Sequence, residues 1–211
     1  MDSDLEQTLT PLQRLALAHA PAKTRRDVLA LLAFDSRLAG VLRQPGEPIL
    51  RQMKLAWWRD ILRTDPSGWP EGEPLLALLR EWQGEYAALV EVVDGWEVLF
   101  GEWLDEQALA RFAHGRAAGW VALAGGAADA ARQAGAQYAL ADLALNLASP
   151  EETARARSAA LAERAKPLPR RLRPLVVLRG LTRRALEKGA ETPLDGPGAA
   201  LTALRLGLFG R

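Results

Sequence analysis

The sequence predicts an all-α protein with a single domain. Hydrophobic residues make up 49% of the 211 residues, and they are mainly alanine and leucine, which favour helix over strand. Apolar positions recur at helical spacing along the chain, and no segment forms a convincing strand. The length lies within the range of one domain, roughly 50 to 250 residues. We therefore expect one domain over residues 1–211, a bundle of about nine or ten helices.

The first three helices are marked by capping residues and turns. Thr10 followed by Pro11 is a typical helix start, with a capping hydroxyl and a proline in the first turn. A second helix is predicted over 24–42, where apolar positions and Asp35 follow helical spacing. The Gln-Pro-Gly sequence at 44–46 ends it, and a third helix is predicted over 48–62.

The second half of the chain is predicted to continue as helices. A break is expected at Asp94-Gly95, and Ser149 before proline and two acids is a strong helix start. No fixed-period repeat is present, so a compact bundle is favoured over a solenoid. The remaining helices are predicted at 74–93, 95–104, 105–123, 127–148, from 149 to before 167, 170–188, and after 197.

Charge and composition exclude several classes of protein. Lys and Arg (27) nearly balance Asp and Glu (26), so no whole-protein field attracts nucleic acid, and no nucleic-acid recognition motif is present. The absence of cysteine excludes disulfides and thiolate metal sites. The acidic N-terminus does not resemble a signal peptide, and no apolar run approaches the roughly 20 residues of a membrane span. We expect a cytoplasmic protein and leave peripheral membrane contact open.

The segment over residues 33–62 shows a specific pattern. Ala33-Phe34 lies in the second predicted helix, and Trp57-Trp58-Arg59 lies in the third. This segment resembles the first signature of squalene/phytoene synthases, where aspartates after the Ala-Phe pair hold magnesium against a prenyl diphosphate. Magnesium needs oxygen ligands. In this chain the aspartate positions are occupied by Ala39, Gly40 and Arg43.

The resemblance extends over most of the chain. Residues 93–96 are similar to the short helix start of that family, and 112–119 resemble its helix of small residues around the prenyl tunnel. The second metal motif is matched by Gly135 and Asp142, but Leu145-Asn146 stands where Arg-Asp is expected. The resemblance implies a fold of the isoprenoid synthase type, and the loss of both motifs implies that catalytic and metal-binding residues are missing.

The resemblance also implies a role. Relatives with degraded motifs include a mitochondrial branch that acts in the assembly of respiratory complex I. By this resemblance we expect a non-catalytic protein that binds a lipid-like ligand, such as a prenyl compound, or a protein partner. The alternative is a prenyl diphosphate-condensing transferase whose magnesium is held by acids that the motifs do not reveal.

Several residues are candidates for a ligand pocket or a partner surface. Core packing is expected for at least one tryptophan of the pair, and Trp58 is the better partner candidate because it lies off the main apolar stripe. Asp35 and Asp142 lie on apolar helix faces, where an ion pair is the default and a residual metal pair is the alternative. The candidates are Phe34, Asp35, Trp57, Trp58, Arg59, Gly119, Tyr138 and Asp142.

Three further features allow more than one interpretation. The acids Glu91, Asp94 and Glu97 are interpreted as a solvated helix face rather than a displaced metal site. The arginines between 170 and 184 allow contact with lipid phosphates or an acidic partner, or an ordinary amphipathic helix. The apolar segment 199–209 is predicted to dock on the bundle rather than on a membrane.

Overall fold

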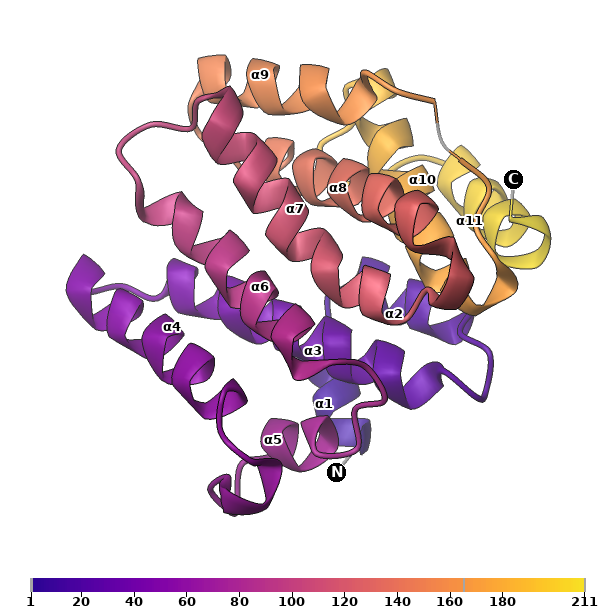
Figure 1. Cartoon of the computed structure of the whole chain (residues 1–211). Coiled ribbons are helices and arrows are strands. Elements are labelled where there is room, and N and C mark those ends of the chain that lie inside the picture. Colours follow the sequence, from indigo (N-terminus) through magenta and orange to yellow (C-terminus); the bar gives the residue numbers. More distant parts are fainter. Residues whose placement is uncertain (1, 165, 211) are drawn as a thin grey trace.

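The prediction of an all-α protein is confirmed. The computed structural model describes residues 2–164 and 166–210 (Figure 1), and in this part it has eleven α-helices, four short 3-10 turns and no strand. The α-helices are Asp2–Thr8 (α1), Pro11–Ala18 (α2), Arg25–Arg43 (α3), Pro48–Leu62 (α4), Pro74–Leu79 (α5), Tyr86–Glu97 (α6), Glu106–Ala122 (α7), Ala128–Ala144 (α8), Pro150–Leu161 (α9), Arg173–Lys188 (α10) and Gly198–Phe209 (α11).

The predicted helix starts at Thr10 and Ser149 are confirmed. The Thr10 hydroxyl accepts a hydrogen bond from the Gln13 backbone N–H at 3.2 Å, and the Gln13 side chain accepts from the Thr10 N–H at 2.9 Å. This reciprocal pair is a capping box, which satisfies two backbone donors at the start of α2. The Ser149 hydroxyl accepts from the Glu152 N–H at 3.4 Å and caps α9.

The predicted break at Asp94-Gly95 is wrong, because α6 continues without interruption to Glu97. The chain leaves the helical conformation earlier, at residues 80–85, between α5 and α6. Gly95 serves close packing: a Cβ there would lie 3.0 Å from the Arg116 backbone nitrogen. A Cβ on Gly115 would lie 2.4 Å from the Glu91 carbonyl oxygen. The two glycines therefore let the backbones of α6 and α7 approach each other.

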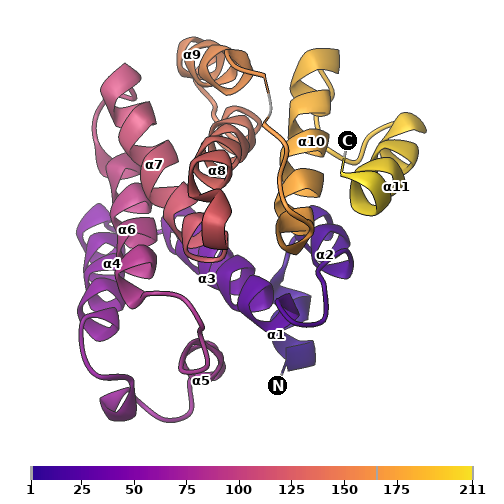
Figure 2. The same ribbon diagram turned by 45° about the vertical axis from the view of Figure 1, so that its right-hand side comes forward.

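The helices form one bundle in which α7 and α8 are central. Figure 1 shows α6 and α4 on one side of this pair and α10 and α11 on the other, and Figure 2 shows α3 running beneath α7 and α8. In both views α4 and α11 lie at opposite outer edges. The centre of the bundle is therefore enclosed by α3, α6, α7 and α8.

Candidate functional site

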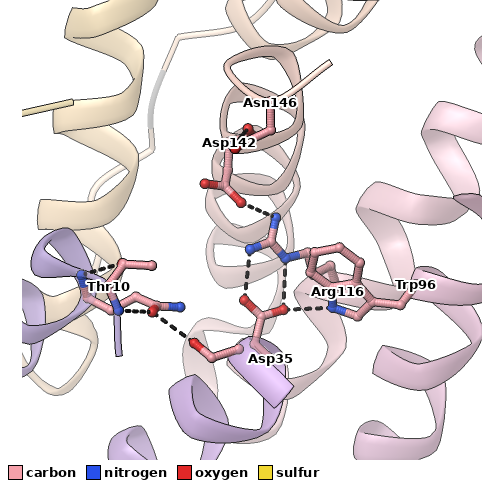
Figure 3. Close-up of polar contacts among 8 residues, drawn as sticks. Thr10, Asp35, Trp96, Arg116, Asp142 and Asn146 are labelled. Carbon is pink, nitrogen blue, oxygen red and sulfur yellow. Dashed lines mark hydrogen bonds and ion pairs between the residues drawn. The ribbon is translucent and has the colours of Figure 1, made fainter. Parts of the chain in front are cut away.

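Arg116 of α7 lies at the centre of the candidate site. Its Nε donates to Asp35 Oδ1 at 2.8 Å, and its Nη2 donates to Asp35 Oδ2 at 2.7 Å, which forms a bidentate pair (Figure 3). The Trp96 indole N–H donates to the same Asp35 Oδ1 at 2.9 Å. The carboxylate of Asp35 on α3 thus accepts three hydrogen bonds from α6 and α7. Bidentate pairs of this kind are among the strongest polar contacts in proteins.

Asp142 approaches Arg116 from the opposite side, on α8 (Figure 3). Its Oδ2 lies 2.8 Å from Arg116 Nη1, although the alignment is not that of a hydrogen bond. Arg116 therefore bridges Asp35 and Asp142, which come from the two segments that resemble the synthase motifs. The prediction that Asp35 and Asp142 are held in ion pairs is confirmed.

Aromatic rings and burial complete the surroundings of Arg116. The guanidinium carbon lies 4.7 Å from the Trp96 ring centroid, 5.0 Å from that of Tyr138 and 5.7 Å from that of Phe112. Burial disfavours the charge, but attraction to Asp35 and Asp142 outweighs it and raises the pKa of Arg116 well above its ordinary value. Burial, and then the charge of Asp142, raise the pKa of Tyr138. Arg116 is therefore permanently charged and Tyr138 neutral.

We call Asp35, Trp96, Arg116, Tyr138 and Asp142 the Arg116 cluster. Arg116 itself was not among the sequence candidates, because its nearest neighbours along the chain are small residues and α7 presents no clear apolar stripe. The signal that the sequence did contain is a single charge inside the run Gly-Arg-Ala-Ala-Gly at 115–119. Such a run lets neighbouring helices approach, so a charge within it becomes buried and must find a partner.

Gly119, one of the candidates, serves this helix packing. A Cβ at Gly119 would lie 2.3 Å from Leu31 Cδ1, so the glycine allows α7 to contact α3. Phe34 is also a packing residue, because it is fully buried and its ring makes an edge contact with that of Trp58 at 5.3 Å.

A cavity of about 310 Å³ lies beside the Arg116 cluster. Gln13 of the capping box accepts a hydrogen bond from the Ser36 hydroxyl at 2.9 Å at the edge of this cavity, which links α2 to α3. The candidates Asp35, Tyr138 and Asp142 all line it. Its apolar wall comes from six further side chains, Ala39, Leu42, Leu99, Phe112, Leu143 and Leu147.

The prediction that Trp58 is the better partner candidate of the two tryptophans is wrong. Trp58 is 3% exposed and packs inward with Leu55 and Leu62, whereas Trp57 is 43% exposed. Both faces of α4 are apolar. Helical spacing alone therefore could not decide which of the two faces packs against the bundle. The prediction that at least one of the two packs in the core is confirmed.

Arg59, the last candidate, joins α4 to α6. Its Nε donates to Asp94 Oδ1 at 2.7 Å, and its Nη2 pairs with Glu97. Glu91, Asp94 and Glu97 are partly exposed, which confirms the prediction of a solvated face. Across residues 2–164 and 166–210, no group of three or more His, Asp or Glu side chains is arranged to hold a metal ion.

Comparison of this chain with family models, with curated proteins and with solved structures gives no match. The resemblance to squalene/phytoene synthases therefore depends only on the residues and motifs described in the sequence analysis. Within the described part of the chain, none of the helices has the length and apolar character needed to cross a membrane.

Proposed function

We propose that this protein is a non-catalytic member of the squalene/phytoene synthase type that acts by binding. The observation that carries the proposal is the Arg116 bridge between Asp35 and Asp142. In the active enzymes that the sequence resembles, the carboxylates of the two motif regions hold magnesium. Here a guanidinium lies between the two remaining carboxylates, and Asp35 already accepts three hydrogen bonds. Arg116 thus supplies from within the chain a cation that contacts both acids and neutralises one of their two negative charges.

The size of the cavity beside the Arg116 cluster supports the same proposal. Sites for one small ligand usually measure about 300 to 1,000 Å³. The cavity of about 310 Å³ is at the lower end of this range. It therefore has room for one small or lipid-like ligand and not for two prenyl diphosphates side by side, as head-to-head condensation requires.

The outer face of α4 supports a protein partner as the bound molecule. Trp57 is partly exposed, and three neighbours on the same face, Ile49, Leu50 and Met53, are more than half exposed. Contiguous apolar side chains on a surface typically mark an interaction site, and tryptophan is a frequent anchor of such contacts. Because α4 also buries its opposite face, this outer face is free of any packing role in the bundle. From the resemblance, we propose that binding of this partner contributes to the assembly of a respiratory complex.

An activity assay tests the non-catalytic part of the proposal. The purified protein is incubated with farnesyl or geranylgeranyl diphosphate, magnesium and a reductant, and the products are separated by chromatography. We expect no condensed hydrocarbon. Turnover that Asp35→Asn abolishes in a folded variant would overturn the proposal in favour of the transferase alternative.

A capture experiment tests the partner surface. The tagged chain is compared with Met53→Asp on α4 and with the control Leu201→Asp, an apolar position on α11 at the opposite edge that is also more than half exposed. We expect a partner that is retained by the wild type and the control and lost by Met53→Asp. Equal capture by all three proteins would contradict an α4 partner surface.

A further inference from the structure

α11 docks on the bundle with one face and leaves a second apolar face outside. Ala199, Ala203 and Leu206 are buried, which confirms the predicted docking of this segment on the bundle. The helix contains no acidic residue, and Arg205 is its only charge. Four large apolar side chains of α11 are more than half exposed: Leu201, Leu204, Leu208 and Phe209.

Two glycines lie where the inner face of α11 packs on α10 and α2. A Cβ on Gly180 of α10 would lie 2.3 Å from Leu206 Cδ1, and a Cβ on Gly207 would lie 2.1 Å from the His19 ring. Both contacts are possible only because the glycines have no side chain. The outer apolar face is therefore a consequence of how the inner face packs on α10 and α2.

A basic groove of about 810 Å³ borders this apolar face. Arg205 and Phe209 of α11 line one side of the groove, and α10 lines the other. The described residues that line it include seven arginines and lysines and a single acid, Glu187. Glu187 pairs with Arg183 at 2.8 Å. The other cations of the groove therefore have no further acid among the described residues that line it.

Arg179 is the most buried cation of this groove, with 8% of its surface exposed. Its one hydrogen bond among the described residues is to the Lys166 carbonyl oxygen, at 3.4 Å. Burial, and then the charge of Arg183, lower the pKa of Arg179. A buried charge is normally paired with an opposite one. Within residues 2–164 and 166–210 no carboxylate pairs with Arg179, so an anion from outside the chain fits this groove.

We propose that α10 and α11 form a docking surface for an anionic phospholipid membrane. The leucines and Phe209 of α11 enter the boundary between headgroups and acyl chains, and the groove binds lipid phosphates. Helices that lie in a membrane interface combine an apolar face with arginine or lysine at its border and lack acids there, as α11 does. This surface is independent of the α4 partner face, because the two helices lie at opposite edges of the bundle (Figure 2).

An acidic protein partner explains the groove less completely. It would neutralise Arg179 and its neighbours, but it would leave the reason for four exposed apolar side chains on α11 unexplained. A phospholipid supplies both the phosphate and the apolar chains in one molecule. The chain as a whole is nearly neutral, with 27 basic against 26 acidic residues. The attraction to anionic lipid therefore comes from the basic groove and not from the net charge of the protein.

Vesicle sedimentation tests the proposal with the full chain. We expect the wild type to bind vesicles of phosphatidylcholine with phosphatidylserine, and to bind pure phosphatidylcholine vesicles far more weakly. Arg205→Gln and Arg179→Met should each weaken binding roughly fivefold, the effect of one basic side chain near an anionic surface. Leu208→Asp should abolish it. The control Ile49→Asp, on α4, should bind like the wild type, and circular dichroism should show all four variants folded.

Three results would overturn the proposal. One is equal binding of the wild type to neutral and anionic vesicles, and another is the absence of vesicle binding altogether. The third is full retention of binding by Leu208→Asp together with competition by inorganic phosphate, which would make the groove a site for free anions. Capture of an acidic protein without vesicle binding would likewise replace the membrane by a protein partner.

Discussion

The protein contains two buried arginines whose surroundings are opposite. Arg116 is 5% exposed and lies between Asp35 and Asp142, whereas Arg179 is 8% exposed and pairs with no described carboxylate. Attraction to the two acids, which outweighs burial, raises the pKa of Arg116, while burial and Arg183 lower that of Arg179. Two arginines with similarly small exposed fractions thus have different roles. A balanced arginine connects helices, and an unbalanced one marks a place for an anion from outside.

The largest effect is expected when the balanced arginine loses its main partner. Asp35→Asn leaves the Arg116 charge buried with only Asp142 beside it, and removing one partner of a buried pair typically costs about 3 to 5 kcal/mol of stability. Urea denaturation followed by circular dichroism measures this loss.

Asp142→Asn is the matched control within the same cluster. Its side chain is partly exposed and its contact with Arg116 is not aligned as a hydrogen bond, so we expect a loss of roughly 1 kcal/mol or less. Equal losses for the two variants would show that Asp35 is not the principal partner of Arg116.

The sequence could predict both acids of the cluster but not the arginine between them. Asp35 and Asp142 were recognised because each interrupts an apolar helix face, and such acids need partners. Arg116 lies in a run of small residues, where periodicity gives no inner face. The contacts of Gly115 with Glu91 and of Gly119 with Leu31 exist only after the helices are packed.

A second prediction concerns the third hydrogen bond to Asp35. Trp96→Phe removes the indole donor and keeps an aromatic ring near Phe112, whose centroid lies 5.5 Å away. A hydrogen bond to a charged group contributes about 1.5 to 3 kcal/mol, so we expect a loss of about 2 kcal/mol in urea denaturation. Trp57→Phe is the control on the exposed face of α4, with an expected change within about 0.5 kcal/mol. A loss for Trp96→Phe as small as that of the control would contradict this role.

The errors of the sequence prediction on α4 and α6 have the same physical origin. Helical spacing gives the faces of a helix but not which face has a neighbour, so the apolar α4 could be placed with Trp57 or Trp58 inward. A glycine can end a helix or allow another backbone to approach, and Gly95 does the second. The caps at Thr10 and Ser149 were predicted because they depend on local residues only. The sequence placed Arg179 in a cluster of arginines, but the lack of a described carboxylate partner for it depends on the fold.

The smallest effect concerns pH at the inner face of α11. Burial, and then the charge of Arg173, lower the pKa of His19 below its ordinary 6.5. The unfolded chain therefore takes up the proton first as pH falls. Stability should be unaffected by His19 above about pH 6.5, should decrease as pH falls toward the folded pKa, and should then level off. His19→Gln should remove this decrease in urea midpoints measured between about pH 7.5 and pH 5.5. An identical pH dependence in the variant would assign the decrease to other groups.

Urea denaturation of Arg116→Met and Arg179→Met in parallel tests the distinction between the two arginines most directly. Methionine keeps much of the apolar stem of each side chain and removes the charge. We expect Arg116→Met to lose about 3 to 5 kcal/mol, because Asp35 remains buried without its cation and the partly exposed Asp142 also loses its partner. Arg179→Met should stay within about 0.5 kcal/mol of the wild type or be more stable. A loss for Arg179→Met equal to that of Arg116→Met would contradict the account, because it would mean that both arginines stabilise the fold in the same way.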